Sequence, residues 1–302
     1  MKSVLFYSFK GGVGRTQTML NIAKYLSKTK NKKVAIVDFD IYAPGISYLA
    51  NFGSDKEDKN YLLEYLLKLV DGIPTKLYYE EHEKNLYLIP SAQPSNLPRY
   101  HNLLTNFSKY LYSLKISAEE RITNQFTAAD AIFDYIMKSI SDLNLNLDYV
   151  FFDCRTGITE VSDILFSNEV DLKVFISSFN NQNINGTNEI LRMLEKQSNF
   201  KHSILRILSP QPINSHDDEF KDINSRANLD HDITLKDKFN WYGTYKISYD
   251  KRIVSNDVDA WDKFTDECLY KKEIISVANN ILSICPVNNE IEELIKKIEN
   301  EK

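Results

Sequence analysis

The chain has 302 residues, of which 43% are hydrophobic and 26% are charged, a balance that is ordinary for a water-soluble globular protein. It carries 37 basic and 42 acidic residues, for a net charge of −5, whereas duplex-binding proteins usually show a basic excess or cluster. No apolar run reaches the roughly 18 residues of a membrane span. The composition therefore argues against a membrane-spanning protein and, more weakly, against nucleic acid as a partner.

Apolar runs alternate with segments of helical periodicity, which predicts an α/β fold. The runs are nearly continuous, as in parallel strands covered on both faces, so we expect a doubly wound, mostly parallel sheet flanked by helices. The predicted strands are 3–7, 33–38, 85–92, 148–153, 171–178, 203–208 and 244–249, and the predicted helices are 16–27, 61–70, 128–141, 187–197, 257–268 and 271–284. We expect one domain over 1–286, a mostly helical insertion at 93–147 with no assigned role, and a C-terminal amphipathic helix at 287–302.

A glycine-rich loop, residues 8–16 with the sequence S-F-K-G-G-V-G-R-T, joins the first predicted strand to the first predicted helix. Strand, glycine-rich turn and helix is the context of a phosphate-binding loop. Glycines let backbone N–H groups converge on an anion, and the helix N-terminus adds unpaired N–H groups and a positive dipole end. The predicted nucleotide-binding residues here are Gly11, Gly12, Val13, Gly14, Arg15, Thr16 and Gln17. A glycine turn without a ligand is the alternative.

Two apolar strands run into acidic residues. Asp38 and Asp40 end the strand at 33–38, and Asp153 ends the strand at 148–153. Ligands of open α/β sheets bind at the carboxyl ends of the strands, and residues two apart in a strand point to the same side. We therefore predict a ligand-binding site at this edge that contains these carboxylates, with the hydroxyl of Thr16 placed to bind Mg²⁺; solvated acids at strand ends are the alternative.

The loop departs from the ordinary G-x-x-x-x-G-K-[ST] pattern, because Phe9 replaces a glycine, Lys10 is an early lysine, and Arg15 replaces the late lysine. The form K-G-G-x-G-[K]-[ST] is the deviant Walker A box, and with V-D-x-D at 37–40 the chain resembles the ParA/MinD family of P-loop ATPases (SIMIBI class). The resemblance implies ATP and Mg²⁺ as cofactors and a homodimer that forms on ATP binding.

The resemblance also implies roles for individual residues. Lys10 reaches the partner subunit's nucleotide, Asp40 positions the attacking water, and Asp38 supports the Mg²⁺ shell. Arg15 stands in for the β/γ-phosphate lysine, and since its planar fork is bulkier than an ammonium, we expect slow turnover. Asp153 holds Mg²⁺ through water, and Gly157 lets the following loop move with the γ-phosphate.

The segment 153–159, D-C-R-T-G-I-T, differs from the D-x-P-P-G or D-x-P-A-G of partition and division-site proteins. It is similar to a version found in bacterial P-loop ATPases that lie beside effector modules in conflict and phage-defence loci. The same branch carries an N-Q-N-x-x-G-T box, here 181–187, at the dimer face; its amides either bond nucleotide or partner backbone, or form an Asx-turn and helix cap.

We therefore expect an ATP-driven dimer switch that controls a separate effector protein. The alternatives are a DNA- or membrane-associated partition or positioning ATPase, a catalytically weak ATP-binding module, and a bacterial tyrosine kinase, whose terminal tyrosine cluster has no counterpart here. Residues 289–302 contain five Glu and three Lys; anionic lipid would repel this helix, so we expect no stable membrane insertion. The chain opens without a signal-peptide pattern, and its three separated cysteines form no disulfide framework or paired metal site, so we expect a cytoplasmic protein.

Overall fold

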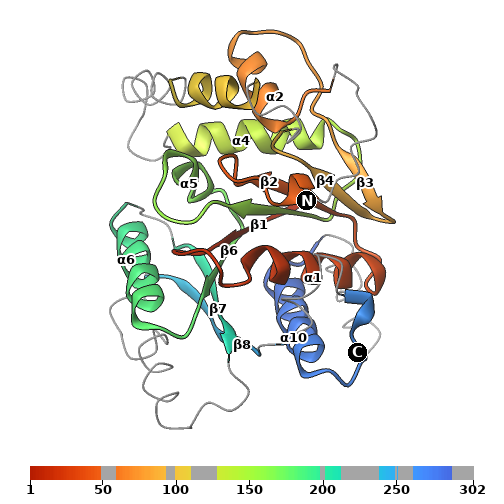
Figure 1. Ribbon diagram of the computed structural model, residues 1–302, viewed down its shortest axis with the longest axis vertical. Helices are drawn as coiled ribbons and strands as arrows, with labels where there is room; N and C mark the ends of the chain where they lie inside the picture. Colours follow the sequence, from red (N-terminus) through yellow and green to blue (C-terminus); the bar gives the residue numbers. More distant parts are fainter. Residues whose placement is uncertain are drawn as a thin grey trace, which may run out of the picture.

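The fold is described from a computed structural model (Figure 1). It describes residues 1–48, 59–92, 99–109, 128–197, 201–211, 238–248, 250 and 261–287. The predicted C-terminal helix lies outside these residues from position 288 onward.

One sheet of eight strands organises the described chain, in the order β3-β4-β2-β5-β1-β6-β7-β8. All neighbouring strands pair in parallel except β3 and β4, which are antiparallel. The predicted doubly wound, mostly parallel fold is thus confirmed. The strands are β1 (Lys2–Tyr7), β2 (Val34–Phe39), β3 (Glu80–Glu83), β4 (Leu86–Ile89), β5 (Tyr149–Cys154), β6 (Leu172–Ser177), β7 (Ser203–Gln211) and β8 (Asn240–Ser248).

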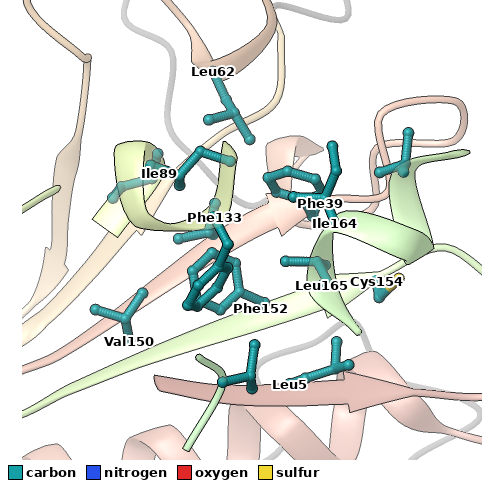
Figure 2. Close-up of a cluster of buried hydrophobic side chains, with 14 of the residues drawn as sticks. Leu5, Phe39, Leu62, Ile89, Phe133, Val150, Phe152, Cys154, Ile164 and Leu165 are labelled. Atoms are coloured by element: carbon teal, nitrogen blue, oxygen red, sulfur yellow. The ribbon is translucent and has the colours of Figure 1, made fainter. Parts of the chain in front are cut away.

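Helices cover both faces of the sheet (Figure 1). Because side chains alternate along a strand, Val4 and Phe6 of β1 pack toward α1 and α10, whereas Leu5 and Tyr7 pack toward the opposite face with α4, α5 and α6. Figure 2 shows that second core, where Phe152 of β5 lies between Leu5 and Phe133. The helices are α1 (Arg15–Lys28), α2 (Leu62–Val70), α4 (Ala128–Ser141), α5 (Glu160–Leu165), α6 (Asn181–Gln197) and α10 (Leu269–Ile284).

The three central strands bring the predicted site together. β5 pairs with β1 on one side and with β2 on the other, and Asp153 is in register with both Phe6 and Asp38. Parallel strands end at the same edge of a sheet, so the glycine loop after β1 and the acidic ends of β2 and β5 lie side by side.

Several elements differ from the sequence-based expectation. The polar strand β3 was not predicted, because its E-E-H-E sequence has no alternation of apolar and polar residues. β3 lies at the edge of the sheet, where charged side chains are common, and Glu83 forms ion pairs with Lys24 and Lys28 of α1. β8 begins four residues earlier than predicted. Of the helix predicted at 257–268, the described residues 261–268 contain a short 3₁₀ turn, Trp261–Lys263.

Within the predicted insertion, the described residues 99–109 and 128–141 are helical. Tyr110 and Tyr112, two of its aromatic residues, lie outside the described residues.

Helix α6 begins six residues earlier than predicted, so the N-Q-N-x-x-G-T box forms its first two turns. The Asn180 side chain accepts a hydrogen bond from the backbone N–H of Asn183 at 2.9 Å, which is the helix-cap role. Gly186 then meets the ring of Phe9 from the glycine loop: a Cβ at position 186 would lie 2.2 Å from Phe9 Cδ1 and 2.5 Å from Cγ. Only a glycine lets this helix approach the loop so closely.

We expect Gly186→Ala to lower the free energy of unfolding by roughly 1–3 kcal/mol, the usual range for overpacking. The better helix propensity of alanine opposes this effect by about 1 kcal/mol. Urea unfolding measures the change, with Glu189→Ala, an exposed position of the same helix, as the matched control. Adding Phe9→Leu to Gly186→Ala should restore part of the loss. A Gly186→Ala protein as stable as the control would show that the ring contact constrains nothing.

Candidate functional site

The glycine loop forms an exposed rim above the N-terminus of α1. Gly12 and Gly14 have φ values of 76° and 75°, in the left-handed region that favours glycine. Gly14 is also the N-cap of α1, and no acidic residue lies in the first turn. Val13 anchors the loop to the protein core, because its side chain packs in the core and is only 2% exposed. Free N–H groups at a helix start, without a competing carboxylate, fit a phosphate.

Arg15 and Thr16, the first two residues of α1, bind both oxygens of one carboxylate. Arg15 Nε donates to Asp153 Oδ1 at 2.6 Å, and Thr16 Oγ1 donates to Asp153 Oδ2 at 2.7 Å. Arg15 also donates to Ser8 Oγ and Asp40 Oδ2, each at 3.3 Å. Burial lowers the pKa of Arg15, but the Asp153 carboxylate and its other neighbours raise it overall, so the guanidinium stays charged between two acids.

Asp38 is fully buried beside this cluster. One of its oxygens accepts hydrogen bonds from Ser47 N at 2.9 Å and Ser47 Oγ at 2.8 Å. Burial, together with the Asp153 carboxylate, raises the pKa of Asp38 to about 8. Burial also raises the pKa of Asp40, although Arg15 and Arg155 oppose that shift. The sheet edge therefore holds three acids against one buried cation.

The cluster leaves acceptors that a nucleotide-bound Mg²⁺ would fit. Asp38 Oδ1, Asp40 Oδ1 and Gln17 Oε1 are buried atoms without a hydrogen-bond partner. Mg²⁺ is usually bound by one or two carboxylates together with phosphates and water. In the described part of the chain, no group of three or more His, Cys, Asp or Glu side chains could hold a metal ion by itself. The residues thus fit a Mg²⁺ ion that arrives with its phosphates.

Lys10 and Gly157 stand outside the cluster. The Lys10 side chain is half-exposed and, within the described residues, makes no hydrogen bond or ion pair. Gly157, with φ of 80°, lies in the loop after β5, next to Ile158, which is 60% exposed. In the same loop, the Arg155 guanidinium lies 4.3 Å from the centre of the Tyr42 ring, so the loops after β2 and β5 touch.

Sequence reasoning missed two residues of the site, Ser8 and Ser47, and one residue beside it, Tyr42. Ser8 precedes the glycines and was visible only as part of the loop, whereas Ser47 and Tyr42 follow the acidic strand end without a recognisable spacing. A search for polar residues in the ten positions after Asp40 would have included both of them, among others.

The strand, glycine loop and helix, together with the acids at the ends of β5 and β2, define a protein of the P-loop class. Residues 1–207 match the AAA domain family AAA_31, and the chain belongs to this family.

Individual relatives are similar over different spans. The virulence plasmid ParA family protein pGP5-D of Chlamydia psittaci is 36% identical over 92 residues, which is 30% of this chain and 34% of that protein. The matches span only 34–39% of the lengths of the curated relatives. McdA of Cyanothece in complex with ATP has a similar structure, with a TM-score of 0.65 and 18% identity over 93% of this chain and 96% of that one.

The septum site-determining protein MinD of Pyrococcus horikoshii, complexed with Mg-ADP, has a TM-score of 0.58 at 15% identity, covering 93% of this chain and 95% of that one. At such identities the likeness concerns the fold. Among the helices of the described residues, none has the length and apolarity to cross a membrane.

We expect Asp38→Asn to change the pH dependence of stability. The folded-state pKa of Asp38 lies near 8, above the ordinary value of about 3.9, so the folded protein keeps a proton that the unfolded chain has lost. This acid therefore costs stability increasingly as the pH rises from about 4 to 8. Asparagine cannot ionise, so the variant should gain up to about 1.4 kcal/mol per pH unit relative to the parent.

Urea unfolding at pH 5, 6 and 7, without nucleotide or metal, measures this difference, and Asp71→Asn at an exposed turn is the control. A gap between variant and parent that stays constant over this pH range would contradict the raised pKa.

Proposed function

We propose that the chain is an ATP-dependent dimer switch of the ParA/MinD type, which binds ATP with Mg²⁺ and hydrolyses it. The observation that carries the proposal is the pair of hydrogen bonds from Arg15 and Thr16 to the two oxygens of Asp153, made by the two residues that follow the left-handed Gly12 and Gly14. The known structures with this fold include complexes with ATP and with Mg-ADP.

The residues have distinct roles in this proposal. Backbone N–H groups of Gly11, Gly12, Val13 and Gly14 bind phosphate oxygens, with Gln17 close to them at the start of α1. Thr16 and Asp153 hold the metal, and Asp38 supports its shell. Mg²⁺, when bound, neutralises part of the charge on the phosphates. Asp40 orients the attacking water, and Gly157 gives the loop after β5 freedom to respond.

Arg15 has to exchange partners when nucleotide binds. In the structure its guanidinium is shared by Asp153, Asp40 and Ser8, and phosphate oxygens would replace some of these acceptors. A guanidinium suits this exchange because its fork binds phosphate oxygens in a bidentate manner. The buried carboxylates compete for the same donors, which supports slow turnover.

Lys10 supplies the proposed contact between subunits. The Lys10 side chain is half-exposed and makes no hydrogen bond or ion pair with the described residues, so it is available to the nucleotide of a second copy. A cation placed there would stabilise charge that develops on the phosphates.

The similar proteins suggest which kind of partner the switch has. The names of the similar proteins, a plasmid ParA family protein and a septum site-determining protein, favour a partition or positioning ATPase. Control of a defence effector rests on the resemblance of residues 153–159 and of the box at 181–187, and stays a prediction. A salt-dependent gel shift with duplex DNA and sedimentation with anionic vesicles would separate DNA- and membrane-associated function from control of a protein effector.

We expect Arg15→Lys to keep ATP binding, because an ammonium at this position retains the charge and reaches phosphate oxygens. The Kd for ATP with Mg²⁺ should stay within about tenfold of the parent, equivalent to about 1.4 kcal/mol, whereas Arg15→Ala should lose more than that. Isothermal titration calorimetry measures both, and Arg192→Lys on the exposed face of α6 is the control. Complete loss of binding in Arg15→Lys would mean that the guanidinium has a different task.

We expect ATP with Mg²⁺ to convert the chain to a homodimer, and Lys10→Ala to prevent this conversion while it still binds ATP. Light scattering gives the mass with and without nucleotide, and Lys84→Ala, at the exposed turn between β3 and β4, should dimerise as the parent does. The same mass for the parent in both conditions would refute the dimer switch.

A further inference from the structure

We propose that Tyr42 is a positioning residue that links the nucleotide site to the helix at 99–109, so that this part of the insertion responds to bound nucleotide. The inference rests on the proposed ATP binding. It gives a role to a segment whose sequence suggests none.

Tyr42 lies two residues after Asp40, in a turn closed by a hydrogen bond from Ala43 N to Asp40 O at 3.0 Å. Its two ends contact different segments. The ring lies 4.3 Å from the Arg155 guanidinium of the loop after β5, and the hydroxyl lies 3.2 Å from Ser108 Oγ on the helix. One side chain therefore touches both loops of the site and the insertion.

A second bond ties the same helix to the same loop. The Tyr100 hydroxyl donates to the backbone carbonyl of Ile41, the residue between Asp40 and Tyr42. The helix thus holds two consecutive residues of the loop from positions two turns apart. A movement of the loop of Asp40 has to strain or break these contacts unless the helix follows.

The inner face of the helix at 99–109 packs into the protein core. Phe107 is 1% exposed and Tyr100 is 9% exposed, both within the large core cluster. Arg99 forms an ion pair at 2.7 Å with Glu64 of α2, whose side chain is 8% exposed. A segment anchored in this way shifts as a unit rather than fraying. Its outer face is exposed at His101, Asn102, Thr105, Asn106 and Lys109.

The electrostatics of the site supply a cause for movement. Arg15 and Arg155 are the two cations that lower the pKa of Asp40, against the effect of burial, which raises it. If phosphates bind Arg15 in place of Asp40, Arg155 remains as the cation beside Asp40. The Asp40 carboxylate then attracts the Arg155 guanidinium away from the Tyr42 ring, because an ion pair in a partly buried site is stronger than a cation–π contact. Tyr42 and Tyr100 transmit the change to the helix.

Hydrogen–deuterium exchange of the full chain tests this, with Mg²⁺ and a non-hydrolysable ATP analogue as the probe. In the parent, amide exchange at 99–109 should change by about twofold to fivefold on adding the analogue, the range that a cation–π contact supports. In Tyr42→Leu the analogue should still bind in calorimetry, but exchange at 99–109 should no longer respond. Tyr135→Leu, at an exposed position of α4, is the matched control and should respond as the parent does.

The outcomes separate the two proposals. A parent that does not bind the analogue overturns the proposed function. A parent that binds it without a change at 99–109, or a Tyr42→Leu protein that responds normally, overturns the link. A folded Tyr42→Leu protein that loses binding also overturns it, since Tyr42 would then belong to the binding site itself. Should Tyr42→Leu fail to fold, Tyr42→Phe keeps the ring over Arg155, removes only the bond to Ser108, and should reduce the response.

Discussion

The buried contact between Arg15 and Asp153 is the interaction on which the site depends. It joins the first residue of α1 to the end of a central strand, at 2.6 Å and with both side chains almost fully buried. Such a pair adds little net stability, because taking two charges out of water costs about as much as their attraction returns. Removing one partner alone leaves a buried charge and costs roughly 3–5 kcal/mol. A contact with these properties is better explained by the chemistry of the site than by folding.

The parallel sheet is what makes this concentration of charge possible. β1, β5 and β2 are adjacent, so the glycine loop, Asp153 and Asp38 are brought to one edge by backbone hydrogen bonds alone. The buried strands β2, β5 and β1 hold these residues in a rigid sheet. Ser47 donates two hydrogen bonds to one oxygen of Asp38. Acids that would repel one another in a flexible chain are therefore held close enough to share a cation.

The loops that follow β2 and β5 are held by different contacts. The loop of Asp40 is held by hydrogen bonds to the helix at 99–109 and by the ring of Tyr42 against Arg155. These contacts are made by individual side chains, whereas the strands are held by continuous backbone pairing. The chain thus combines a glycine loop at the edge of a rigid sheet with neighbouring loops that are held by individual side chains, an arrangement that fits the proposed nucleotide-dependent switch.

The sequence by itself determined the fold class, the glycine loop and the acids at the strand ends, because those signals are local. Glycine adopts the left-handed dihedrals found at Gly12 and Gly14 without a Cβ clash, and a continuous apolar run that ends in an acid predicts Asp153 without knowledge of its partners. Only the tertiary structure decided that Ser47 bonds Asp38, that Phe9 requires a glycine at 186, and that Tyr42 meets Arg155 and Ser108. These partners are separated by up to 177 residues, follow no periodicity, and meet only because strand order and helix packing place them together. The polar strand β3 escaped prediction for the same reason, since its pairing partner and the lysines of α1, rather than its own sequence, make it a strand.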